Sequence, residues 1–180
     1  MKTIKTNLII SAVKDKPISE ATSVFSGWID SDFKNWNCDA TTKTTSETLV
    51  TVSEMDQDLT FAQIFPIPEK QTLTQGQIID FCEEHQDWLR KDGYSTFFLF
   101  KVGGEFFVAD VRWSGRRLEA DVFRLSCDGV WRRGGRRRVV VPQLAPILSG
   151  TSEPLDTLTL EALHNKVDLL MRHLGVSIKK

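Results

Sequence analysis

Residues 97–113 read FFLFKVGGEFFVADVRW, and this stretch decides the fold. Two apolar runs flank Gly103 and Gly104, a pair that can take the positive φ values of a tight β-turn. If this turn sets the register, Phe100 lies opposite Phe107 and the phenylalanines gather on one face. The other face is expected to be apolar near the turn and polar further away. The stretch therefore predicts an antiparallel hairpin with one buried face.

A helix is predicted immediately before this hairpin. Thr74 and Gln77 have the spacing of a capping box, in which each side chain bonds to the backbone N–H of the other residue. From Ile78 onward apolar side chains recur at helical spacing, and Gly93 is typical of a position just beyond a helix end. The pattern predicts an amphipathic helix over 75–92 that packs on the Phe-rich face.

The sheet is predicted to continue past the hairpin through a turn at 114–117. A four-residue loop there pairs Arg112 with Glu119 and leaves only Asp110 opposite Asp121, whereas a two-residue loop opposes like charges twice. The longer loop is therefore favoured. Either loop puts three further apolar residues on the face that carries the phenylalanines, namely Leu118, Ala120 and Val122.

The rest of the chain is expected to add strands and helices to this unit. Apolar and β-branched runs predict strands over 8–13, 48–53, 59–67 and 139–141. Apolar spacing predicts a helix over 18–29. Together these segments predict an α+β fold on an antiparallel sheet, a meander of five or more strands with an amphipathic helix packed on one face.

The whole chain, residues 1–180, is predicted to be a single domain that ends in a C-terminal helix. Three prolines and a Ser-Gly pair indicate a linker over 142–157. Apolar residues at helical spacing then predict an amphipathic helix over 158–174, and they are Leu160, Leu163, Val167, Leu170, Met171 and Leu174.

Composition is that of an ordinary folded globule, since 41% of the 180 residues are hydrophobic and 26% are charged. No stretch approaches the ~20 apolar residues of a membrane span, and the apolar run near the N-terminus is short for a secretory signal. Cys38, Cys82 and Cys127 are odd in number and far apart, which does not suit a disulfide framework. We therefore expect a cytoplasmic protein that uses no membrane, cofactor or metal.

Positive charge is concentrated in one part of the chain, although the net charge is only −1. Residues 112–138 hold nine of the eleven Arg and three acidic residues, a net +6. Gly134 and Gly135 within this part are interpreted as the tip of a β-hairpin. Arginine binds phosphate oxygens in two-point fashion and stacks on bases, so the segment is predicted to bind nucleic acid or an acidic protein surface. The candidate binding residues are Trp131, Arg132, Arg133, Arg136, Arg137 and Arg138.

A structural interpretation of the same segment stays open. Charged hairpin tips are often solvated loops, and edge strands use charge to resist aggregation. The arginines can also meet the acidic N-terminal part of this chain, because residues 1–111 carry 10 basic and 17 acidic side chains, a net −7.

Two further groups of residues suggest chemistry. Cys82 and His85 share one face of the predicted helix, and a nearby imidazole can activate a thiol nucleophile or help to hold a metal. Both lie on the apolar stripe, so a buried thiol beside a hydrogen-bonded His is the alternative. The acidic segments 30–32 and 54–58 could bind a hard cation, although aspartates more commonly form turns.

No nucleotide-binding, nucleophile-elbow or zinc-protease motif occurs in the chain. The sequence therefore favours a small binding module that engages an anionic partner through the Arg-rich hairpin. The first alternative is a structural or protein–protein interaction domain that uses the helix over 158–174 or an open strand edge. The second is an enzyme of unassigned class that uses Cys82 and His85.

Overall fold

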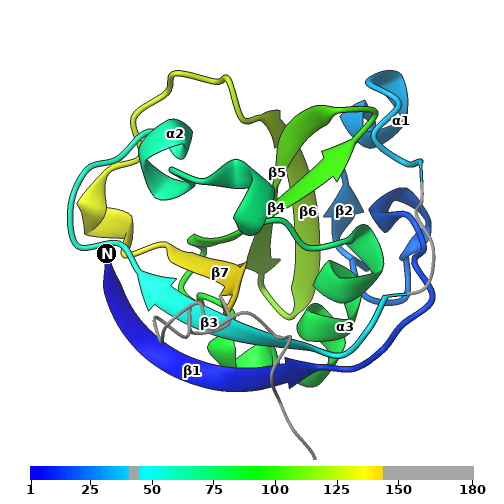
Figure 1. Ribbon diagram of the computed structural model, residues 1–180, viewed down its shortest axis with the longest axis horizontal. Coiled ribbons are helices and arrows are strands. Elements are labelled where there is room, and N and C mark those ends of the chain that lie inside the picture. The colour runs from blue at the N-terminus through cyan, green and yellow to red at the C-terminus, as the bar shows by residue number, and fades with distance from the viewer. Residues whose placement is uncertain (41–44, 144–180) are drawn as a thin grey trace, which may run out of the picture. The chain divides into compact units, whose positions relative to one another are not determined.

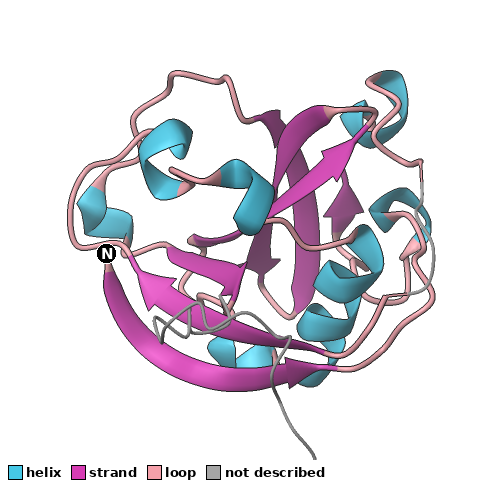
Figure 2. Cartoon of the chain, viewed as in Figure 1, coloured by secondary structure: helices cyan, strands magenta, loops and turns pink. Residues whose placement is uncertain are grey.

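The computed structural model describes residues 1–40 and 45–143 of the chain. It is an α+β structure with a seven-stranded sheet in the order β1-β3-β7-β4-β5-β6-β2 (Figures 1 and 2). Within the described part, no helix has the length and apolar character needed to cross a membrane. The helix predicted over 158–174, and all but residues 142 and 143 of the predicted linker, lie outside the described residues.

The strands are β1 (Lys2–Ile10), β2 (Trp28–Ile29), β3 (Thr48–Glu54), β4 (Ser95–Val102), β5 (Glu105–Ser114), β6 (Arg117–Arg124) and β7 (Arg138–Pro142). The helices are α1 (Asp32–Asn35), α2 (Phe61–Ile64) and α3 (Gln75–Glu84), with 3-10 turns η1 (Ile18–Glu20), η2 (Pro68–Lys70), η3 (Gln86–Trp88) and η4 (Arg133–Gly135).

The sheet is mixed, which corrects the prediction of a purely antiparallel meander. Only β4, β5 and β6 form a meander, while β7 joins β4 in parallel and β2 joins β6 in parallel. The parallel pairs arise because β7 and β2 reach the sheet from distant parts of the chain, which local turn signals do not reveal. In Figure 1, β1 and β3 run across the direction of β5 and β6, so the sheet is strongly twisted.

The register of the central hairpin is as predicted. Phe100 pairs with Phe107, and Arg112 pairs with Glu119 while Asp110 stands opposite Asp121. Pairing between β5 and β6 continues up to Ser114 and Arg117, so the turn holds only Gly115 and Arg116 and is shorter than the predicted four-residue loop. Gly115 permits this short turn because its φ is +61°.

The first face of the sheet is covered by α3. Thr74 and Gln77 form the predicted capping box at the start of this helix. Phe81 of α3 packs edge-on against Phe98 of β4, with ring centroids 5.4 Å apart. The helix is shorter than the predicted 75–92 because His85 leaves the helical conformation (φ −122°, ψ 35°). The chain then continues as η3.

The second face carries its own apolar core, covered by α2. Phe61 of α2 packs against Phe97 of β4 with ring centroids 5.2 Å apart, and both side chains are fully buried. The strand predicted over 59–67 is therefore wrong. Thr60 and Gln63 form a second capping box that starts a helix there.

The N-terminal part also differs from prediction. Residues 18–29 form η1 and then the short strand β2 instead of one helix. Gly27 lies so close to β6 that an added Cβ would be 2.8 Å from Glu119 Cγ. The chain at Gly27 therefore packs closely against β6 and does not continue as a helix.

Strand β1 is irregular and is an outer strand of the described sheet. Its pairing with β3 shifts register twice, between Thr3 and Lys5 and between Lys5 and Leu8. Asn7, which lies within the second of these shifts, has a φ of +57°. The strand is thus bulged along its length.

Candidate anion-binding site

The Arg-rich segment does not form the predicted β-hairpin. Trp131 makes an isolated antiparallel bridge with Leu59, and Arg133–Gly135 form the 3-10 turn η4. Arg136 then takes a left-handed conformation with φ 44° and ψ 45°. Residues 131–138, which we call the Arg loop, reverse direction through this 3-10 turn. The two halves of the loop do not pair with each other as strands.

Trp131 belongs to the core of the second face. Its ring lies 5.1 Å from that of Phe61, 4.9 Å from Phe97 and 5.6 Å from Phe123, measured between centroids. An indole surrounded by three aromatic rings has no free face for a base. Trp131 was predicted as one of the binding residues, but this position favours a structural role in which it anchors the Arg loop.

Arg137 is stacked between two aromatic rings. Its guanidinium carbon lies 4.8 Å from the ring of Trp131 and 5.7 Å from the ring of Tyr94. Its Nη1 also donates to the carbonyl of Arg132 over 3.1 Å. Gly135 lies close to this stack, and an added Cβ would be 2.8 Å from Tyr94 Cδ1. Arg137 therefore fixes the loop by cation–π contact and a hydrogen bond.

Arg138 is engaged inside the protein as well. Its Nη1 donates to the carbonyls of Asp87 and Leu89, at 3.2 and 3.0 Å. Burial, and then the neighbouring charge of Arg90, lower the pKa of Arg138 from its ordinary value. These bonds link the start of β7 to η3, so Arg138 has a structural role.

The remaining three arginines point their charge to solvent. Arg132 and Arg136 have side chains that are 85% and 69% exposed, and Arg133 is exposed too. Arg132 Nη1 lies 4.0 Å from Asp58 and Arg136 Nε lies 3.7 Å from Glu54. The structural interpretation thus applies in part, because these contacts connect the loop to the acidic segment 54–58.

A hollow of about 430 Å³ lies where the Arg loop meets the first and third strands. Arg133, Gly134 and Arg136 line one side of it, and Lys2 and Glu54 are among the residues on the other. The backbone of the loop is held in place here, since the Arg133 N–H donates to Asp58 Oδ1 over 2.7 Å. Two of the three exposed guanidiniums, those of Arg133 and Arg136, therefore stand on a fixed backbone beside a concave surface.

A polar cluster lies on the second face beside the apolar core, at the end that was expected to be polar but was not predicted to be a site. Asp110 is 2% exposed and its Oδ1 has no hydrogen-bond partner among the described residues. Burial raises the pKa of Asp110 to about 6, against the opposing effect of a Ser95 hydrogen bond. Across the strand pair, Asp121 forms an ion pair with Arg112. The like-charged pair Asp110–Asp121 in the predicted register was the available signal for this cluster.

Cys82 and His85 do not form a nucleophile pair. Cys82 is fully buried, and burial raises the pKa of its thiol, which therefore stays protonated. The His85 Nε2 lies 2.7 Å from the carbonyl oxygen of Ile9, to which it can donate. This arrangement is the predicted alternative, a buried thiol and a hydrogen-bonded His, and it gives no support to the catalytic hypothesis.

The acidic segments serve as turns and as partners for basic groups. Asp30 Oδ1 accepts a hydrogen bond from the Asp32 N–H at 3.0 Å, and Asp32 Oδ1 accepts one from Asn35 Nδ2 at 3.0 Å. Asp56 pairs with the terminal amino group of Met1 at 2.9 Å. Residues 1–40 and 45–143 contain no group of three or more His, Cys, Asp or Glu side chains placed to hold a metal ion.

Comparison of the chain with protein-family models, curated proteins and solved structures gives no significant match.

Proposed function

We propose that the protein is a binding module that contacts the phosphate backbone of nucleic acid through Arg132, Arg133 and Arg136. One observation carries the proposal: these three guanidiniums are exposed on a loop whose backbone is fixed by its other residues. A loop that is already ordered loses little conformational entropy when it binds, and this favours recognition.

The internal partners of these arginines are weak competitors for a phosphate. The pairs with Asp58 and Glu54 span 4.0 and 3.7 Å, and the Arg132 and Arg136 side chains stay largely in water. Exposed pairs of this kind contribute about 0–1 kcal/mol. The guanidinium of Arg133 has no ion pair within the described residues. Exchange of these contacts for charge-assisted bonds to phosphate oxygens is therefore inexpensive.

Binding of this kind is expected to be insensitive to base sequence. Both faces of the sheet are covered, so the sheet offers no aromatic platform for unstacked bases. Trp131 is enclosed by other rings. Contacts to the backbone position a nucleic acid without reading its sequence.

The test uses fluorescence anisotropy with labelled single- and double-stranded oligonucleotides. The variant R132Q/R133Q/R136Q removes three positive charges without placing new carboxylates beside Asp58 and Glu54. A matched control, K14Q/K16Q/K34Q, removes three exposed charges from α1 and the segment after β1, outside the Arg loop. Arg137 and Arg138 are left unchanged because their substitution would disturb the fold.

The parent protein and the lysine control are expected to bind both oligonucleotides, with affinity falling steeply between about 50 and about 200 mM salt. The arginine variant should bind at least about tenfold more weakly, and the slope of log affinity against log salt should fall by about 2–3. Equal loss in both variants, or no binding by the parent at about 50 mM salt, would contradict the proposal. Binding of a polyglutamate peptide in place of the oligonucleotides would assign the loop to an acidic protein partner.

A further inference from the structure

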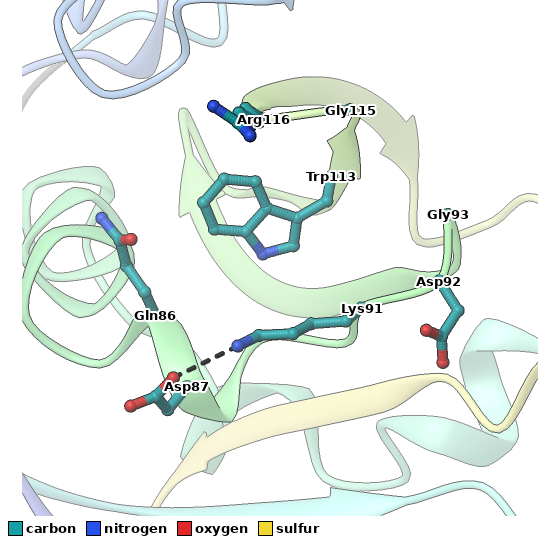
Figure 3. A pocket seen from close by; sticks show the side chains of 8 residues that line it. All are labelled: Gln86, Asp87, Lys91, Asp92, Gly93, Trp113, Gly115 and Arg116. Atoms are coloured by element: carbon teal, nitrogen blue, oxygen red, sulfur yellow. Dashed lines mark hydrogen bonds and ion pairs between the residues drawn. The ribbon is translucent and has the colours of Figure 1, made fainter.

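A second hollow lies beside the two-residue turn between β5 and β6 and has a volume of about 510 Å³. One wall is built from η3 and the loop that follows it, and the other from the end of β5 and the turn itself (Figure 3). The Arg loop contributes no residue to this hollow, which we call the Trp113 pocket. Its size lies within the range of about 300–1,000 Å³ typical of small-ligand sites.

An aromatic ring forms the centre of the pocket wall. Trp113 packs partly against the core of the first face, and in Figure 3 its six-membered ring projects between Gln86 and Arg116. Gly93 and Gly115 lie on the rim with φ values of +76° and +61°. A Cβ added at either glycine would meet nothing within 4 Å, so the rim beside the ring is open. A flat ligand can therefore approach the indole.

The charges around the pocket leave one cation without a partner. Lys91 Nζ pairs with Asp87 Oδ1 at 3.2 Å, and Asp92 pairs with Arg90 at 3.4 Å. Arg116 is exposed and makes no ion pair with any described residue. After these pairings, an uncompensated guanidinium remains beside the indole, which is an arrangement suited to a ligand that is both aromatic and anionic.

We propose that the Trp113 pocket binds a planar heteroaromatic ring with an attached phosphate, such as a nucleoside monophosphate. The ring stacks against Trp113, the phosphate accepts a forked pair of hydrogen bonds from Arg116, and the Gln86 amide contacts polar atoms at the edge of the ring. A ring with its attached sugar and phosphate fills more of the pocket volume than a free ring does. This site is separate from the Arg loop and does not depend on the function proposed for it.

Isothermal titration calorimetry with three kinds of probe tests this site. AMP and UMP carry both ring and phosphate, adenosine carries the ring alone, and inorganic phosphate carries the anion alone. The variants are R116Q, which removes the cation, and the pair W113L and W113F, of which only the second keeps an aromatic ring. R132Q/R133Q/R136Q is the control for general loss of positive charge.

A monophosphate is expected to bind the parent protein more tightly than adenosine or phosphate. R116Q should weaken monophosphate binding about tenfold and leave adenosine unchanged, since one charge-assisted contact accounts for about that factor. W113L should weaken both ligands, and W113F should restore most of the loss. The triple arginine variant should bind as the parent does.

Three results would overturn the proposal: no heat at millimolar AMP and UMP, equal affinity for phosphate alone, or insensitivity to R116Q. Arg116 is an exposed turn residue, so R116Q leaves the fold intact and decides the matter even if W113L does not fold. Failure of the Arg loop to bind oligonucleotides would not affect any of these measurements, and the two proposals are distinguishable.

Discussion

The two faces of the central sheet are built from the same strands but differ in polarity and in the helices that cover them. The first face is almost entirely apolar under α3, with Thr96 as a buried polar residue on it. The second face is apolar under α2 and Trp131, and along the same strands it becomes polar at Asp110 and Asp121. Regular alternation along one hairpin determines which side chains of β4 and β5 belong to the first face, although β1, η1 and β3 also contribute to its core. The second face likewise depends on segments that are distant in sequence, and its polar end leaves a buried carboxylate oxygen with no hydrogen-bond partner among the described residues.

This difference has a physical consequence for stability. A fully apolar, closely packed face gains from burial alone, whereas burial of a carboxylate costs free energy unless its oxygens are paired. The first face should therefore respond to loss of volume only, and the second face should respond to volume, charge and pH.

The largest effect is expected from two neighbouring phenylalanines on β4. Phe97 points to the second face and Phe98 to the first, and both are fully buried. If both faces are true cores, F97A and F98A should each lower the free energy of unfolding in urea by about 3–5 kcal/mol. A loss below about 1 kcal/mol for F97A, with the full loss for F98A, would show that the second face is loosely packed and is not a true core. Leucine substitutions at both positions provide the same comparison with smaller losses if the alanine variants do not fold.

A smaller effect, which depends on pH, is expected at Asp110. Its pKa in the folded protein is raised to about 6 by burial, above its ordinary value. Stability from this group is therefore fully present below about pH 4 and is lost as pH rises through about 6. D110N has no carboxylate at this position and does not lose stability in this way. The free energy of unfolding of D110N minus that of the parent should therefore be larger at pH 7.5 than at pH 4, by up to about 3 kcal/mol. Urea unfolding at several pH values measures this difference.

The control for this prediction is D128N, which changes an exposed carboxylate in the loop after β6. Its stability relative to the parent should vary little with pH. If the stability of D110N relative to the parent varied equally little with pH, the buried Asp110 carboxylate would cost no more free energy than a carboxylate on the surface.

The smallest expected effect is a difference in stability between variants of two arginines of the Arg loop, Arg138 and Arg136. R138Q loses two hydrogen bonds to the carbonyls of Asp87 and Leu89 and should destabilise the protein by about 1–2 kcal/mol. R136Q replaces an exposed guanidinium with a neutral amide and should change stability by less than about 0.5 kcal/mol. Thermal or urea unfolding compares the two variants directly. Equal losses would mean that the exposed arginines also hold the fold.

Features fixed by local sequence were predicted well. The register of Phe100 with Phe107 follows from a two-glycine turn and alternating side chains, and the start of α3 follows from Thr74 and Gln77. The spacing of Thr60 and Gln63 is the same capping signal. It was overlooked because the apolar run over 59–67 also fits a strand, and the second core was missed with it.

The sequence shows which segment carries the clustered arginines but not which of them are exposed and which are engaged inside the protein. Five arginines in one short segment look alike in sequence. Arg137 differs from the exposed arginines by its contacts with Trp131, Tyr94 and the Arg132 carbonyl. Arg138 differs by its hydrogen bonds to the Asp87 and Leu89 carbonyls, about 50 residues away. No local pattern reports such contacts, so the exposed set of three could be recognised only in three dimensions.

The bulged strand β1 has a consequence for how molecules of this protein behave in concentrated solution. A flat outer strand is a template on which another chain can extend the sheet. Here the two register shifts and the left-handed Asn7 interrupt the regular row of backbone groups, and Lys2 and Lys5 add positive charge along the same strand. A second strand could not match this edge over more than a few residues. β1 thus acts as a built-in barrier to fibril-like growth at that side of the sheet.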